Sequence, residues 1–295
     1  MPATIARMNQ PLPVRVVAEL QVDGAPLSAA SGLVRIDDAL HVVADDELHL
    51  AIFDLQGGAG RLLRLQGGEL PHEAKARKAA KPDFEALIAW PDGRLLALGS
   101  GSRPNRERGV WFDPSGAVPP QGVDLAPLYA SLRLEFGDLN IEGGFVIGDE
   151  LRLLQRGNTQ RAVNACAVFE LAAFAACAHG GAAPALRRVQ RYELGLRDGV
   201  PLGFTDGAAL PDGCWLFSAA AEDTTDAYRD GACAGSAIGL VDADGVLCLQ
   251  VPLAGAWKVE GLHAQPQDDG IALLMVTDAD DPARPASLLS AVLRR

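Results

Sequence analysis

A short element recurs five times along the chain at intervals of roughly fifty to sixty residues, and this repeat constrains the fold more than any other feature. The copies read SGLV from Ser31, FEALIA from Phe84, IEGGFV from Ile141, TDGAAL from Thr205 and VEGLHA from Val259. After each copy come a turn containing Asp or Gly and a second apolar run, such as LHVVAD or CWLFSAAA. Each unit is therefore interpreted as two strands joined by a tight turn.

A third and a fourth strand-like run follow in most units. Four antiparallel strands per repeat are typical of a propeller blade, so the sequence predicts an all-β, five-bladed β-propeller. The fifth repeat stops after its third run, SLLSAVLRR, whereas the run VRVVAELQV precedes the first repeat without a partner. Pairing these two runs would close the ring and remove an exposed sheet edge. We expect the N-terminal strand, residues 13–22, to complete the C-terminal blade.

The repeats leave no obvious linker, so residues 1–295 are predicted to form a single domain. Its blades should start near residues 31, 84, 141, 204 and 259.

Charge and hydropathy exclude two classes of partner. The formal net charge of −12 argues against general binding to nucleic acid or to an anionic membrane surface. No apolar run reaches the roughly 18 residues that suggest a membrane span. The first residues, MPATIARMNQPLP, lack the apolar segment of a signal peptide, which predicts a cytoplasmic protein. We further expect a monomer.

One position of the repeat carries acidic or hydroxyl side chains. Alignment on the small residue of each motif places five residues at the start of the innermost strands: Ser31, Glu85, Glu142, Asp206 and Glu260. Carboxylates gathered around a propeller axis repel one another unless protonation, basic partners or a bound cation compensates them. Oxygen ligands favour Ca²⁺ or Mg²⁺, and a wide ring completed by water suits Ca²⁺ better. Alternatively, these residues cap turns and accept hydrogen bonds from adjacent blades without a metal.

The order Ser, Glu, Glu, Asp, Glu, in the contexts SGLV, KPDFEAL, LNIEGG, FTDGAAL and KVEGL, resembles the calcium-activated nucleotidase (apyrase) family. Members of that family are five-bladed propellers with a central Ca²⁺ that hydrolyse nucleoside di- and triphosphates, so the resemblance implies phosphoanhydride chemistry. The chain departs from the pattern in the fourth blade, where the family has a serine and this sequence has Thr205-Asp206. Similar EGL-type repeats also occur in phytase-like and SdiA-regulated propeller domains.

Further polar residues should reach the same rim. Three carboxylates, at or after the ends of second strands, are candidates to accept a proton during catalysis: Asp46, Glu222 and Asp278. Four basic residues are candidates for binding an anionic substrate: Lys81, Arg103, Arg156 and Lys258. The competing interpretation of each is a solvated turn or a loop residue that aids solubility.

Two functions from different classes follow. The first is a metal-dependent hydrolase, with Ca²⁺ or alternatively Mg²⁺, that acts on a phosphorylated or otherwise anionic small molecule at the mouth of the central channel. The second is a non-catalytic ligand-binding or scaffold propeller in which the central ion is structural. A lactonase or sugar hydrolase using the same metal also fits a propeller, although no residue singles it out.

Overall fold

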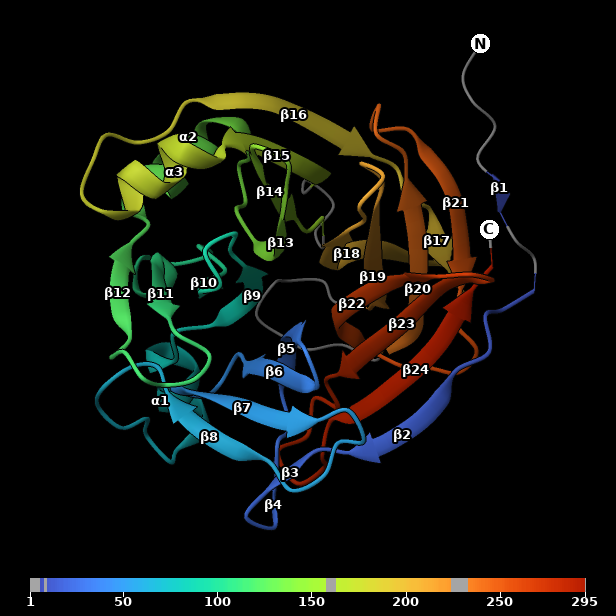
Figure 1. Cartoon of the computed structure of the whole chain (residues 1–295), viewed down its shortest axis with the longest axis horizontal. Helices are drawn as coiled ribbons and strands as arrows, with labels where there is room; N and C mark the ends of the chain where they lie inside the picture. Colours follow the sequence, from blue (N-terminus) through green and yellow to red (C-terminus); the bar gives the residue numbers. More distant parts are fainter. Residues whose placement is uncertain (1–5, 8–9, 158–162, 224–232, 295) are drawn as a thin grey trace.

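Five sheets surround a common axis in the computed structural model, which describes residues 6–7, 10–157, 163–223 and 233–294 (Figure 1). The first blade contains, from the axis outward, β5 (Ala30–Ile36), β6 (Ala39–Ala44), β7 (His49–Asp54) and β8 (Arg61–Arg64). The second contains β9 (Phe84–Ala89), β10 (Leu95–Gly99), β11 (Arg108–Phe112) and β12 (Gln121–Asp124). The third contains β13 (Ile141–Ile147), β14 (Glu150–Gln155), β15 (Asn164–Glu170) and β16 (Leu186–Tyr192).

The fourth blade is built from β18 (Val200–Ala209), β19 (Trp215–Glu222), β20 (Cys233–Val241) and β21 (Leu247–Pro252). Two short strands extend its sheet, β17 (Leu196–Arg197) and β1 (Ala6–Arg7). The fifth blade contains β22 (Val259–Gln267), β23 (Gly270–Thr277), β24 (Ser287–Leu293) and β2 (Arg15–Glu19). The prediction of a five-bladed propeller is confirmed.

The N-terminal strand closes the ring as the sequence predicts. Strand β2 pairs antiparallel with β24, with Arg15 opposite Ser290 and Glu19 opposite Ser287. The segment before β2 also contacts the fourth blade, because β1 pairs parallel with β21 and Leu12 forms a bridge with Leu253. The first residues therefore join the fourth and fifth blades, and the contact with the fourth blade was not expected from the repeat.

The apolar core is divided among the blade interfaces. Each of five clusters of buried side chains lies between two neighbouring blades. On β10, for example, Leu95 and Ala97 pack towards the first blade, whereas Leu96 and Leu98 pack towards the third. Since both faces of such a strand are buried, its sequence is apolar throughout instead of alternating with polar residues.

Three α-helices lie in the connections that the structure describes: α1 (Ala74–Ala80), α2 (Ala126–Glu135) and α3 (Leu171–Ala178). Helix α1 precedes β9, and Glu73 caps its N-terminus by accepting the N–H groups of Lys75 and Ala76. None of the described helices is long and apolar enough to cross a membrane.

Candidate functional site

Each inner strand has a β-bulge at the position where the repeat carries its polar residues. In four blades the unpaired residue of the bulge is the predicted one: Ser31, Glu85, Glu142 and Glu260. A bulge turns the side chain of its extra residue away from the regular alternation of the strand. The repeated motif is therefore a device that presents one polar side chain per blade at the axis.

In the fourth blade, the structure shifts the predicted alignment of the repeats by one residue. Phe204 pairs with Ala219 and Asp206 pairs with Ser218, so Thr205 is the extra residue of this bulge. The Thr205 hydroxyl lies 2.8 Å from the Ser218 hydroxyl. Asp206 is the residue after the bulge, and its carboxylate accepts the N–H groups of Leu262, at 2.8 Å, and Gly207, at 2.7 Å. Placing Asp206 in line with the three glutamates was wrong.

Glycine follows the bulge in three blades because the inner strands approach one another closely there. A Cβ atom on Gly32 would lie 2.9 Å from the nitrogen of Leu87, and one on Gly261 would lie 2.9 Å from the nitrogen of Leu33. A Cβ atom on Gly143 would lie 2.7 Å from the Cα of Asp206. The recurrent Gly of the motif is thus required by the narrow axis of the propeller.

Arg156, directly after β14, joins carboxylates from three blades. Its Nη1 lies 3.1 Å from Glu142 in the third blade and 3.7 Å from Glu260 in the fifth. Its Nη2 lies 2.8 Å from Glu222 at the end of β19. The guanidinium is buried, with 5% of the residue exposed, so Arg156 neutralises part of the buried negative charge of these three glutamates.

Lys258 makes a second set of ion pairs beside Arg156. Its Nζ lies 2.6 Å from Asp280 and 3.1 Å from Asp278, and 3.6 Å from Glu260 and 3.8 Å from Glu222. Asp278 and Glu222, two of the predicted proton acceptors, therefore share a basic partner with Glu260. Both are held by basic side chains.

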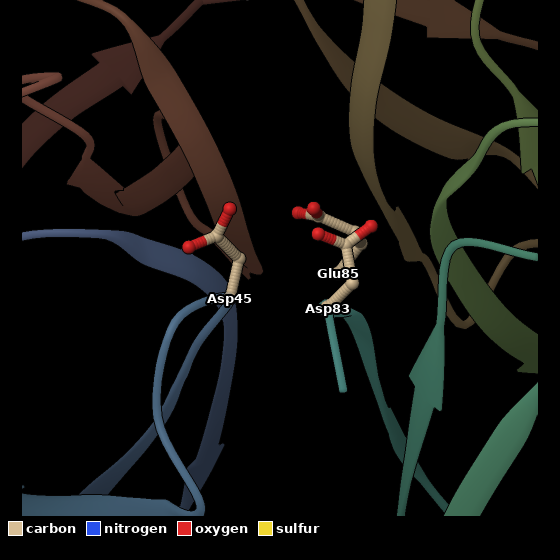
Figure 2. Close-up of side chains that lie close together, drawn as sticks. All are labelled: Asp45, Asp83 and Glu85. Atoms are coloured by element: carbon tan, nitrogen blue, oxygen red, sulfur yellow. The ribbon is translucent and has the colours of Figure 1, made fainter. Parts of the chain in front are cut away.

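A third group of charges lies between the first and second blades. Carboxylate oxygens of Asp45, Asp83 and Glu85 lie within 4.8 Å of one another (Figure 2). Lys81 forms ion pairs with Asp45 and, at 3.1 Å, with Asp83. Asp83 has a positive φ of 59° and also accepts a hydrogen bond from Arg106, at 2.7 Å. Asp83 was not among the predicted site residues, although it stands two residues before Glu85 in KPDFEAL.

Three further predicted residues are Asp46, Arg103 and Ser31. Asp46 pairs with Arg77 of α1 at 3.6 Å, so its neighbour Asp45 is the residue that joins the cluster. Arg103 is half-buried before the 3₁₀ turn η1 (Pro104–Arg106), and Arg106 is the arginine that contacts Asp83. The Ser31 hydroxyl donates to the Phe84 carbonyl at 2.5 Å and thereby links the first two blades.

The mouth is more acidic than basic. The described side chains that these contacts join include eight carboxylates, Asp45, Asp83, Glu85, Glu142, Glu222, Glu260, Asp278 and Asp280. They include four cations, Lys81, Arg106, Arg156 and Lys258. Burial is the main cause that raises the pKa of Glu260 to about 8 and the pKa values of Asp45 and Asp280 to about 7. The pKa of Glu85 is raised well above its usual range, by burial and by Glu142.

Glu260 is the least satisfied of these carboxylates. Both of its oxygens are buried and neither has a hydrogen-bond partner among the described residues. Its nearest cations, Lys258 and Arg156, remain 3.6 Å and 3.7 Å away. A buried carboxylate without hydrogen bonds is costly unless a proton or a bound cation neutralises it. The donor set, made of carboxylate oxygens, fits a hard divalent cation such as Ca²⁺.

The raised pKa values predict how stability depends on pH. A carboxyl group whose pKa is higher in the folded than in the unfolded chain favours folding at low pH, and this contribution is lost as the pH rises through the folded-state value. We expect the melting temperature of the metal-free protein to fall between about pH 5 and about pH 8, where Asp45, Asp280 and Glu260 lose their protons. Thermal melts in chelator across this range test the expectation. Glu260→Gln should flatten the fall, and a flat wild-type profile would contradict it.

One family model matches the chain over residues 26–293, and it is described as a family of unknown function (DUF6929). The chain belongs to this family. The DUF6929 match includes the bulge of every blade, from Ser31 to Glu260. No curated protein matches the chain. DUF6929 carries no assigned activity, so the family match adds no support for a nucleotidase. The resemblance to calcium-activated nucleotidases rests on the motifs at the blade starts alone.

Solved structures similar to this DUF6929 chain share little sequence with it. A proposed glycoside hydrolase from Parabacteroides distasonis has a TM-score of 0.51 and 10% identity, over 91% of this chain and 88% of that chain. The tail fibre of Staphylococcus aureus phage P68 has a TM-score of 0.50 and 12% identity, over 95% of this chain and 53% of that one. A gluconolactonase from Xanthomonas campestris has a TM-score of 0.45 and 12% identity, over 95% and 89%. The matches with TM-scores of 0.51 and 0.50 show similarity of fold alone, because their identities are far too low to transfer an activity.

Proposed function

We propose that the channel mouth binds a divalent cation, in first place Ca²⁺, and that the chain is a cation-dependent hydrolase of a phosphorylated or otherwise anionic small molecule. The observation that carries this proposal is Glu260, whose two buried oxygens lack hydrogen-bond partners among the described residues. Glu85 and Glu142 occupy the equivalent bulges of the second and third blades, so we propose them as ligands together with Glu260. Carboxylate oxygens of Asp45 and Asp83 lie within 4.8 Å of one of Glu85. Mg²⁺ is the alternative ion.

When bound, such a cation polarises a phosphoryl oxygen and lowers the pKa of a coordinated water. Proton transfer would then fall to carboxylates beside the ring. Asp278 is one candidate, because Lys258 and the Asp280 hydrogen bonds hold its pKa below the usual range although burial acts to raise it. It is therefore ionised at neutral pH, although a lowered pKa also makes it a weaker base. Glu222, held by Arg156 at 2.8 Å, is the second candidate.

The basic side chains are placed to meet an anion once the cation is present. Arg156 and Lys258 now contact the carboxylates that would hold the ion. A cation bound by Glu142 and Glu260 would neutralise part of the negative charge of these carboxylates. Some N–H donors of Arg156 and Lys258 would then be available to an anionic group of the substrate. Lys81 stands in the same relation to Asp45 and Asp83.

The second candidate function is a non-catalytic ligand-binding propeller with a structural ion. The extensive ion pairing favours it, because Lys81, Arg156 and Lys258 are each at most 9% exposed and are already engaged by carboxylates. Metal analysis of the purified protein should be combined with a screen for phosphate release from nucleotides, sugar phosphates and phytate, with Ca²⁺ and with chelator. If the protein contains calcium but turns over none of these compounds and no sugar lactone, the non-catalytic propeller with a structural ion is favoured.

Calcium is expected to stabilise the folded protein. A ligand that binds only the native state adds RT ln(1 + [L]/Kd), about 2.7 kcal/mol at a hundredfold excess over Kd. The melting temperature should therefore rise with Ca²⁺ and fall with chelator. Glu142→Gln should weaken this response, because it removes a ligand oxygen, and its matched control is Glu69→Gln at an exposed site. If calcium leaves the wild-type melting curve unchanged, the cation proposal fails.

A further inference from the structure

Asp206 occupies a place on the propeller axis that no other blade fills in the same way. The residue after the bulge is Gly32, Ala86, Gly143 and Gly261 in the other blades, and none of these has a polar side chain. Asp206 is 1% exposed and lies in β18, one residue beyond the bulge at Thr205. The fourth repeat therefore places one carboxylate among the inner strands at the level where they approach most closely.

The carboxylate of Asp206 links the inner strands of the fourth and fifth blades and approaches that of the first. Its Oδ2 accepts the N–H of Leu262, in the fifth blade, at 2.8 Å. Its Oδ1 accepts the N–H of Gly207, next to it in the fourth blade, at 2.7 Å. The main-chain N–H of Leu33, in the first blade, acts to lower the pKa of the same carboxyl group, so we expect it to be a further donor. The partners of Asp206 are thus main-chain donors and not basic side chains.

These donors explain why a carboxylate is stable at this place. In the fifth and first blades the inner strands β22 and β5 are the axial edges of their sheets, so their outward N–H groups have no neighbouring strand within the blade. A buried main-chain donor without an acceptor costs about as much as a lost hydrogen bond. Burial raises the pKa of Asp206, and the N–H groups of Leu262 and Gly207 act in the opposite direction. Asp206 and the edge donors therefore satisfy one another.

We infer that Asp206 is a positioning residue, which fixes the inner strands of the fourth, fifth and first blades to one another and thereby sets the place of Glu260. Leu262 follows Glu260 by two residues, and Leu33 follows Ser31 by two residues. A hydrogen bond at Leu262 thus restrains the same short segment that carries the unpartnered carboxylate. Asp206 itself makes no ion pair with a described side chain at the mouth, so its role differs from that of Arg156. The calcium readout of this inference rests on the function proposed above, whereas the main-chain readout does not.

The test compares Asp206→Ala and Asp206→Asn with the wild type, and Asp212→Ala serves as the matched control. Asp212 is an exposed carboxylate in the turn after β18 that accepts the N–H of Cys214. Hydrogen exchange of peptides containing Leu33 and Leu262 reports the links directly. Asp206→Ala should lose protection at both, whereas Asp206→Asn, which keeps one acceptor, should lose less. If Asp206→Ala does not fold, Asp206→Asn alone decides through the same peptides.

Calcium titration by calorimetry supplies the second readout. Loss of a residue that orients a metal ligand typically weakens metal affinity about tenfold or more, so we expect Kd to rise by about this factor in Asp206→Ala and to be unchanged in Asp212→Ala. Unchanged exchange at Leu33 and Leu262 would overturn the inference whatever the metal result. Lost protection together with an unchanged calcium Kd would limit Asp206 to a structural role and also overturn it. If the wild type binds no calcium, the proposed function fails, and the exchange data still decide whether Asp206 holds the strands.

Discussion

A chain that lacks residues 1–20 is expected to melt far below the full chain or to accumulate as insoluble protein. The deletion removes β2 and leaves β24 as an open hydrophobic edge. It also removes Leu20, which is fully buried in the cluster between the fifth and first blades. Soluble yield and thermal unfolding followed by circular dichroism measure the effect.

The matched control for this deletion removes residues 1–7 and leaves β2 in place. Strand β1 contributes a parallel pairing of two residues, Ala6 with Leu249 and Arg7 with Gln250, so its loss should cost much less. A chain without residues 1–20 that is as stable as the full chain would show that the ring does not depend on closure by β2.

Arg156→Met is expected to lower the free energy of unfolding by about 3–5 kcal/mol at neutral pH, the usual cost of removing one partner from buried ion pairs. The substitution keeps an unbranched apolar stem but leaves Glu142, Glu222 and Glu260 without the guanidinium that they share. Urea unfolding gives the value. Arg187→Met is the control, because Arg187 makes its pairs with Asp149 and Glu170 at the surface and should cost at most about 1 kcal/mol.

The same substitution should make stability more sensitive to pH. Arg156 acts to lower the pKa values of Glu142 and Glu260, which burial raises. Without it both folded-state values should rise further, so the loss of stability in Arg156→Met should be smaller at about pH 5 than at about pH 8. A loss that is equal at both pH values would indicate that Arg156 contributes through packing and not through charge.

The blade count and the ring closure could be predicted because they follow from features that sequence displays directly. A repeat is visible as recurring motifs, and the unpaired run before Ser31 matches the strand that the last repeat lacks. The apolar strands could also be recognised in the sequence. Their continuous hydrophobicity reflects the burial of both strand faces between neighbouring blades. The pairing of β1 with β21 lies outside the repeat and left no comparable signal.

The site was predictable in its residue types and less so in its geometry. The bulges at Glu85, Glu142 and Glu260 confirm that one motif position is structurally equivalent in these blades. In the fourth blade, two polar residues stand together, and only strand register shows that Thr205 is the extra one. Lys81 and Lys258 were predicted to bind an anionic substrate, yet in the structure both form ion pairs with carboxylates. Side-chain direction in loops depends on tertiary contacts that a motif does not contain.

The closure of the ring also determines the order in which the chain can complete its fold. Strand β2 is synthesised before any blade, but its partner β24 follows the strands of the other four blades. The first four blades can pair locally as they emerge, whereas the fifth must wait until β24 meets β2, and contacts between such distant segments form slowly. Until then β2 and the edge of the fifth blade stay unpaired, so the protein should be most prone to aggregate before this closure.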